Sequence, residues 1–257
     1  MCPLGLAPGY DGRHARGVNS HPLAHTPRSR SSWLLALALG AFALGLGCSG
    51  GSDPDALRCR GPECVCLDGP CAFDCDTVTT AREACDFECR GDATCDVACT
   101  EACEVECAPG TSCSVDASDA GSVDCVGAEC SFAIDGRAEV GCERSAECDA
   151  TVGDDSELDC EGSSSCRFTG GARVDVDCED GSVCEITTGE GSDVECLRAE
   201  CRATVGVGTA VYCGIEASCE IACTGACELE CVPGASCALR CAGDADANLV
   251  SGLARCE

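Results

Sequence analysis

The sequence predicts an all-β protein, a disulfide-stapled β-solenoid of about ten two-strand coils with about 18 residues each. Three observations support this prediction. Cysteine accounts for 32 of the 257 residues, the cysteines recur in two columns at a nearly constant period, and apolar residues flank both columns at a spacing of two. Such a cysteine content is typical of a disulfide scaffold in an oxidising compartment outside the cytosol.

The two cysteine columns define the repeat. The second column follows the first by five or six residues, and after the first interval the first column advances by 17 or 18 residues per step. The first column is Cys66, Cys89, Cys107, Cys125, Cys142, Cys160, Cys178, Cys196, Cys213 and Cys231. The second column is Cys71, Cys95, Cys113, Cys130, Cys148, Cys166, Cys184, Cys201, Cys219 and Cys237.

Apolar side chains accompany both columns with a period of two. They stand two places before the first cysteine, as Val140 and Val176 do, and two places after the second, as Phe132 and Phe168 do. This alternation predicts two short strands per repeat, each with one apolar face, separated by turns rich in Gly, Ser and Asp. A unit of this size cannot bury its face alone, so the coils should stack with strands about 4.8 Å apart. A helix over 95–107, where cysteines recur every four residues, is the local alternative.

Pairing the columns within each coil accounts for twenty cysteines. Eight others fall in the opposite turn of the first two and last two coils, where extra staples would cap the exposed solenoid ends, and Cys59 is left to pair with Cys64. The predicted additional bridges are Cys59–Cys64, Cys75–Cys85, Cys99–Cys103, Cys223–Cys227 and Cys241–Cys256. Pairing up a column, between neighbouring coils, remains an alternative. Metal–thiolate chemistry is a weaker one, because the sequence has no CxxC.

The N-terminal region predicts export. Arg28 and Arg30 precede an apolar run of 14 residues, from Trp33 to Leu46, which is shorter than the roughly 20 residues of a membrane-spanning helix. The run ends in "GLGCSGG", which resembles the lipobox of bacterial lipoproteins, although Gly45 stands where that family usually has leucine. The resemblance implies that Cys48 is acylated and becomes the mature N-terminus, and that Ser49 directs the protein to the outer membrane.

Cleavage after Ala43 by ordinary signal peptidase is the competing interpretation. It would leave Cys48 as an odd thiol beside fifteen bridges, so the cysteine count favours lipidation. The predicted organisation is a signal peptide with an N-terminal extension at 1–47, a lipidated tether at 48–58 and the cysteine-rich solenoid at 59–257. The cysteines and the export signal together predict a cell-envelope protein.

The mature chain would be strongly acidic. Residues 48–257 contain 44 acidic residues and 12 arginines, a net charge of −32, with neither lysine nor histidine. This charge disfavours nucleic-acid binding and attracts cations. On the first strand of successive coils, the outward positions Glu157, Asp159, Asp175, Asp177, Asp193 and Glu195 would stack into two carboxylate rows. These rows are a candidate Ca²⁺ site, with a purely solvated acidic face as the alternative.

The sequence contains no catalytic constellation, so we expect a protein that is not an enzyme and has no cofactor, apart from the Ca²⁺ alternative. The predicted function is that of a non-catalytic, membrane-anchored structural or interaction protein, such as a surface spacer or an adhesin-like rod. Its expected partners are the membrane, through the lipid anchor, and an unknown envelope protein, extracellular protein or glycan. A row of Thr151, Thr169, Thr187 and Thr204 resembles one column of flat ice-binding solenoids, but the neighbouring row is charged.

Overall fold

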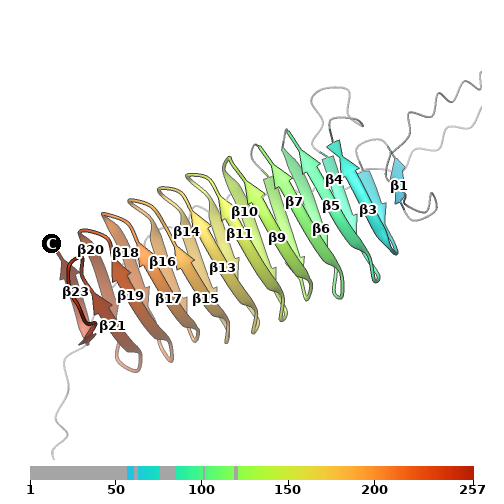
Figure 1. Ribbon diagram of the computed structural model, residues 1–257. Coiled ribbons are helices and arrows are strands. Elements are labelled where there is room, and N and C mark those ends of the chain that lie inside the picture. Colours follow the sequence, from blue (N-terminus) through green and yellow to red (C-terminus); the bar gives the residue numbers. More distant parts are fainter. Residues whose placement is uncertain (1–56, 61–62, 76–84, 101, 119–120) are drawn as a thin grey trace, which may run out of the picture. The chain divides into compact units, whose positions relative to one another are not determined.

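A computed structural model describes residues 57–60, 63–75, 85–100, 102–118 and 121–257. The predicted signal peptide, Cys48 and residues 49–56 of the predicted tether lie outside these residues. The described chain consists of strands and turns and confirms the predicted β-solenoid (Figure 1). It contains no helix long and apolar enough to cross a membrane.

Successive strands alternate between two sheets. The first sheet has twelve strands: β1 (Leu57–Arg60), β2 (Glu63–Cys66), β4 (Cys85–Cys89), β6 (Cys103–Cys107), β8 (Gly121–Val126), β10 (Ala138–Glu143), β12 (Glu157–Cys160), β14 (Asp175–Glu179), β16 (Asp193–Leu197), β18 (Thr209–Cys213), β20 (Cys227–Cys231) and β23 (Gly252–Cys256).

The second sheet has eleven strands: β3 (Pro70–Asp74), β5 (Thr94–Cys99), β7 (Ser112–Ala117), β9 (Glu129–Ile134), β11 (Glu147–Val152), β13 (Ser165–Gly170), β15 (Val183–Thr187), β17 (Glu200–Val205), β19 (Ser218–Cys223), β21 (Ser236–Arg240) and β22 (Asn248–Val250). Residues 95–107 contribute to strands β5 and β6, so the helical alternative for this segment is wrong.

Neighbouring coils pair parallel and in register. In the first sheet, Cys142 lies beside Cys125 on one side and Cys160 on the other. In the second sheet, Cys148 lies between Cys130 and Cys166 in the same way. Each position of the repeat therefore forms a row of equivalent side chains along the solenoid.

The core lies between the two sheets, as the period-two pattern predicts. All nine apolar residues two places before the first cysteines, from Phe87 to Leu229, are buried, and so are all ten residues two places after the second, from Phe73 to Leu239. Phe73 and Phe87 pack against each other with ring centroids 5.1 Å apart. Cysteines, valines and alanines fill most of the remaining interior.

Thirteen disulfides join the described cysteines. Ten of them close the turn between the two columns of each coil, so these bridges coincide with the pairs expected from the sequence and not with pairing along a column. The expected bridges Cys59–Cys64, Cys223–Cys227 and Cys241–Cys256 are also present.

The predicted bridges Cys75–Cys85 and Cys99–Cys103 are not among these thirteen. In-register pairing of β3 with β5 places Asp74 opposite Ala98, and therefore Cys75 beside Cys99. The Sγ atoms of Cys75 and Cys99 lie 3.1 Å apart, so sulfurs of this turn approach each other between coils, and Cys99 also contacts Cys103 within its own coil. Hydrogen bonding to the sulfurs of Cys103 and Cys75, together with burial, raises the pKa of Cys99 above its usual value.

Antiparallel strands cover three of the solenoid edges. At the N-terminal end β1 pairs antiparallel with β2, and at the C-terminal end β23 and β22 pair antiparallel with β20 and β21. Cys59–Cys64 holds the first of these strands and Cys241–Cys256 the end of β23. The caps thus combine strand reversal with disulfides, whereas the sequence predicted disulfides alone.

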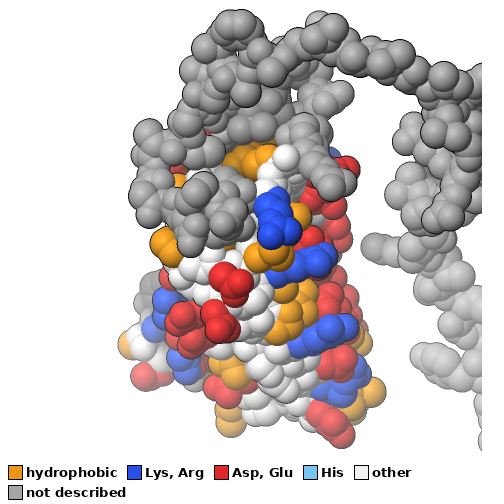
Figure 2. Space-filling view, turned by 90° about the vertical axis from the view of Figure 1, so that its right-hand side faces the viewer, with side chains coloured by type: hydrophobic (Ala, Val, Ile, Leu, Met, Phe, Trp, Pro, Cys, Tyr) orange, Lys and Arg blue, Asp and Glu red, His pale blue; other side chains and the backbone are white. Residues whose placement is uncertain are grey.

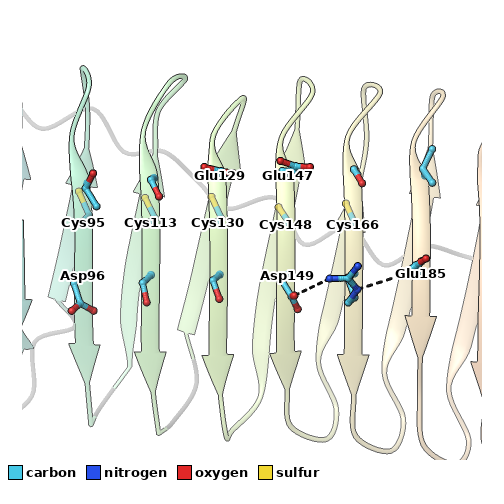
Figure 3. A pocket seen from close by; sticks show the side chains of 17 residues that line it. Cys95, Asp96, Cys113, Glu129, Cys130, Glu147, Cys148, Asp149, Cys166 and Glu185 are labelled. Carbon is cyan, nitrogen blue, oxygen red and sulfur yellow. Dashed lines mark hydrogen bonds and ion pairs between the residues drawn. The ribbon is translucent and has the colours of Figure 1, made fainter. Parts of the chain in front are cut away.

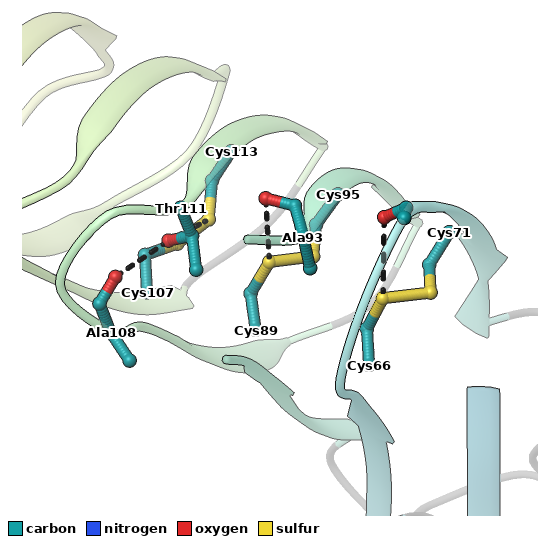
Figure 4. Close-up of a disulfide and its surroundings, with 10 residues drawn as sticks. Cys66, Cys71, Cys89, Ala93, Cys95, Cys107, Ala108, Thr111 and Cys113 are labelled. Atoms are coloured by element: carbon teal, nitrogen blue, oxygen red, sulfur yellow. Dashed lines mark hydrogen bonds between the residues drawn. A yellow bond between two sulfur atoms is a disulfide. The ribbon is translucent and has the colours of Figure 1, made fainter. Parts of the chain in front are cut away.

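Buried hydroxyl groups satisfy backbone groups next to the disulfide turns. Thr111 Oγ1 donates a hydrogen bond to the carbonyl of Ala108 at 2.7 Å, beside the Cys107–Cys113 bridge (Figure 4). Three coils later, Ser164 Oγ donates to the carbonyl of Glu161 and accepts from the backbone N–H of Ala146 in the preceding coil. These hydroxyls add hydrogen bonds to backbone groups that also pair with the backbone of their own turn.

Stacked glycines line the turn opposite the disulfide column. Gly153, Gly171, Gly189 and Gly206 recur at the coil period, and a Cβ atom on Gly189 would lie 2.7 Å from the carbonyl oxygen of Gly171. The backbones of successive coils therefore approach too closely here for any side chain.

We expect Gly189→Ala to lower the free energy of unfolding by about 2 kcal/mol, because the added methyl group would push neighbouring coils apart. Guanidinium unfolding of the oxidised protein measures this. Gly141→Ala is the matched control, since its Cβ would meet only the flexible side chain of Asp124, at 3.0 Å. Equal destabilisation by the two substitutions would contradict the close-approach explanation.

Candidate functional site

The acidic candidate site lies on the outward face of the first sheet. In-register pairing of β12, β14 and β16 places Asp175 between Glu157 and Asp193, and Asp177 between Asp159 and Glu195. We call these six residues the acidic face. The structure therefore brings all six predicted residues together in two parallel rows, because side chains at alternate positions of adjacent strands project from the same side.

We call the row of Asp159, Asp177 and Glu195 the second acidic row, and its carboxyl groups have raised pKa values. Partial burial, reinforced by surrounding acidic side chains, raises the pKa of Asp177 to about 7 and that of Asp159 to about 6. The same causes raise the pKa values of Asp124 and Glu195. In the part of the chain that the structure describes, neither Asp159 nor Asp177 forms an ion pair with an arginine.

The acidic face can therefore gather cations or protons. Carboxylate oxygens in neighbouring rows are the hard ligands that Ca²⁺ prefers, and stacking of like charges favours any bound positive charge.

The outward face of the second sheet has a different charge pattern. Arg167 pairs with Asp149 at 3.2 Å and with Glu185 at 3.3 Å, and Arg202 pairs with Glu185 at 3.8 Å and with Glu220 at 3.3 Å. Opposite charges thus alternate along five coils. The predicted threonine row runs beside this row in register, from Thr151 to Thr204.

A shallow groove of about 680 Å³ crosses the second sheet from β5 to β15 (Figure 3). One rim is formed by the residues before the second-column cysteines: Thr94, Ser112, Glu129, Glu147, Ser165 and Val183. The other rim is formed by the residues after them: Asp96, Ser114, Ser131, Asp149, Arg167 and Glu185. Beyond β15 the same two rows border a smaller hollow of about 210 Å³ between β17 and β21.

Sulfur atoms in the disulfide column lie close enough together to suggest a metal site. Those of Cys142, Cys148 and Cys166, for example, lie within 4.8 Å of one another. Both Cys142–Cys148 and Cys160–Cys166 are disulfides, however, and disulfide sulfurs lack the thiolate charge that binds zinc or iron. This column fits structural stapling better than metal binding.

Charged side chains of both signs are interspersed on the visible described surface. Figure 2 shows arginines lying beside Asp and Glu, with hydrophobic side chains scattered among them. In the turns, Arg173 pairs with Asp155 at 2.6 Å and lowers the pKa of that carboxyl. Arg198 likewise pairs with Asp180 of the preceding coil.

Two features of this surface were missed at the sequence level. The sequence predicted a charged row beside Thr151–Thr204, and this is the row of Arg167 and Arg202, but its continuous ion pairing and the adjacent groove were not predicted. The spacing of about 18 residues between Asp149, Arg167 and Glu185 was the available signal for the pairing. The groove has a weaker signal, namely the small residues Ser114 and Ser131 between larger charged ones.

Comparison with known proteins adds no relative: no family model, curated protein or solved structure gives a significant match. The geometry itself defines the class of this protein, a cysteine-rich tandem-repeat β-solenoid stapled by disulfides.

We expect Asp177→Asn to stabilise the protein at about pH 8 by on the order of 1 kcal/mol, a value reduced by solvent screening of this half-exposed group. Because the folded-state pKa is raised to about 7, protonation contributes stability that is complete below the unfolded pKa of about 4 and is lost as pH rises through 7. The wild type should therefore gain stability between about pH 8 and pH 5, and the advantage of the variant should shrink over that range.

Guanidinium unfolding across this pH range measures both effects. The matched control is Glu185→Gln on the second sheet, whose carboxylate contacts Arg167 and Arg202, so its loss should give no stabilisation. A wild type that loses stability on mild acidification would contradict the predicted role of the second acidic row.

Proposed function

We propose that this chain is a membrane-anchored, extracytoplasmic and non-catalytic structural or interaction protein, a stapled rod that acts as a spacer or adhesin-like element of the cell envelope. The observation that carries the proposal is the repeated scaffold. One coil recurs along the described chain, and each coil contributes a disulfide at the same position.

Three features support this function. Disulfides at this density suit an exported protein. The short loops that they close, typically of five or six residues, each contribute on the order of 2 kcal/mol in the chain-entropy model, which favours resistance to unfolding outside the cell. The apolar run before Cys48, with its resemblance to a lipobox, provides the means of attachment.

Lipidation is tested by metabolic labelling with a clickable fatty acid in the native host, followed by membrane fractionation. We expect label on the wild type and its loss in Cys48→Ser, because Cys48 is the proposed acceptor. Cys2→Ser is the matched control and should behave as the wild type, since it lies upstream of the proposed cleavage site. Unlabelled wild type with a mature N-terminus at Leu44 would exclude the lipid anchor.

A second candidate function is low-affinity binding of divalent cations, Ca²⁺ in particular, at the acidic face. The supporting observation is the in-register stacking of carboxylates from β12, β14 and β16. An ion bridging successive coils would relieve their mutual repulsion and should raise stability.

Calorimetric titration of the purified full chain with CaCl₂ tests this function. We expect measurable heat and a higher melting temperature at millimolar Ca²⁺, both reduced in the double variant Asp159→Asn/Asp177→Asn. Asp149→Asn, which changes a carboxylate already paired with Arg167, should leave both signals intact. Absence of both heat and thermal shift would exclude the Ca²⁺ function.

A further inference from the structure

Four buried cysteines gather in the turn that leads from the second sheet to the first, at the N-terminal end of the solenoid. They lie outside the thirteen disulfides between described cysteines, and each is only 2% to 4% exposed. We call this set, Cys75, Cys85, Cys99 and Cys103, the cysteine quartet. The first two flank the turn of one coil, and the last two flank the same turn of the next coil.

In-register stacking brings the sulfurs of the quartet together. Cys85 is the register partner of Cys103, and Cys75 lies beside Cys99 because the preceding residues of β3 and β5 are partners. The sulfur of Cys99 lies 3.1 Å from that of Cys75 and also forms a hydrogen bond with that of Cys103. One sulfur therefore contacts partners both across coils and within its own coil, whereas a disulfide joins only two sulfurs.

The opposite end of the solenoid provides an internal comparison. The segment "CTEAC" at 99–103 recurs as "CTGAC" at 223–227 in the same turn, and there the two cysteines form a disulfide. The pair in the next coil, Cys241–Cys256, is also a disulfide and lies in register with the first pair. Equivalent positions of the repeat thus carry disulfides at one end and clustered thiols at the other.

The quartet lies beside the one solenoid edge that no described strand covers. Strands β1, β22 and β23 cover the other three edges, whereas β3 is the outermost described strand of the second sheet (Figure 1). An edge strand frays easily, since its backbone groups are paired on one side only. A link from Cys75, at the end of β3, to Cys99, at the end of β5, would hold this edge strand in place.

Four cysteines in two adjacent pairs are a common ligand set of structural zinc. Zn–S bonds of about 2.3 Å in a tetrahedron place neighbouring sulfurs about 3.8 Å apart, so the contact of 3.1 Å between Cys75 and Cys99 would lengthen by about 0.7 Å. The three residues between Cys99 and Cys103 are within the usual range for two zinc ligands on one turn. Tetrahedral sulfur sites favour zinc or iron, and zinc itself has no redox chemistry.

We propose that the cysteine quartet is a structural zinc site that links β3 to β5 and β4 to β6. Four Zn–S bonds form as the four thiol protons leave to solvent, and burial of the ligands limits the access of oxidants to the thiolates. Zinc would stabilise the uncovered edge, as strand reversal stabilises the other three. The site goes beyond the spacer function and does not depend on whether Cys48 carries a lipid.

The zinc content of the purified full chain tests the proposal. The protein is prepared without reductant from cells supplied with ZnCl₂ and dialysed against citrate, and mass spectrometry should then find about one zinc ion per chain. We expect Cys99→Ser/Cys103→Ser to lower this content at least about tenfold, because two of four ligands are lost. The matched control is Cys223→Ser/Cys227→Ser, which removes the equivalent pair from "CTGAC" and should retain the zinc.

Alkylation of the unreduced wild type in guanidinium and a strong chelator, followed by peptide mapping, determines the state of the quartet directly. We expect all four cysteines to be alkylated. Peptides in which any two of them are joined by a disulfide, in place of alkylated cysteines, would overturn the proposal. A wild type without zinc, or equal zinc in the two double variants, would overturn it as well.

Hydrogen exchange of the wild type covers the case in which a double variant fails to fold. Removal of zinc by a strong chelator should speed amide exchange in β3 at least about tenfold and leave β21 unchanged, because only β3 is held by the quartet. Unchanged exchange in β3 would contradict the stabilising role. All these outcomes are independent of the lipid-labelling experiment, since none of them involves Cys48.

Discussion

In-register stacking of each coil on the next is the constraint on which the rest of the structure depends. Parallel strands about 4.8 Å apart place every side chain between its equivalents in the adjacent coils. A substitution at one position therefore changes the contacts of the equivalent residues in the two adjacent coils. Like charges meet like charges on the first sheet, whereas Arg167 and Arg202 make the equivalent row on the second sheet alternate in sign and become self-neutralising.

The same constraint explains the unusual core. Coils of about 18 residues leave space for only two or three inward side chains per strand, so the interior consists mainly of cysteine, valine and alanine with an occasional phenylalanine. Such an interior buries little apolar area per residue, and disulfides supply the missing stabilisation by restricting the unfolded chain. Glycines such as Gly189 are required where stacked turns approach without space for a side chain.

The fold could be predicted from the sequence because Cys and apolar residues recur at the same positions of every coil. Val140 and Phe168, for example, are buried as their spacing from the cysteines predicts. The reversed end strands β1, β22 and β23 lie outside the repeat and had no periodic signal. The predicted Cys75–Cys85 and Cys99–Cys103 pairs rested on spacing along the chain, whereas the structure brings Cys75 and Cys99 together across coils. The acidic face followed from strand alternation, but the groove depends on side-chain size and on ion pairing across coils.

The disulfides are almost all local in sequence. Of the thirteen disulfides between described cysteines, twelve join residues only four to six positions apart, and Cys241–Cys256 spans 15 positions. Each of these cysteines can therefore meet its partner by a short loop closure before distant cysteines compete. Such a chain can oxidise vectorially, each finished coil serving as the template for the next, which limits the scrambling that threatens a protein with so many thiols.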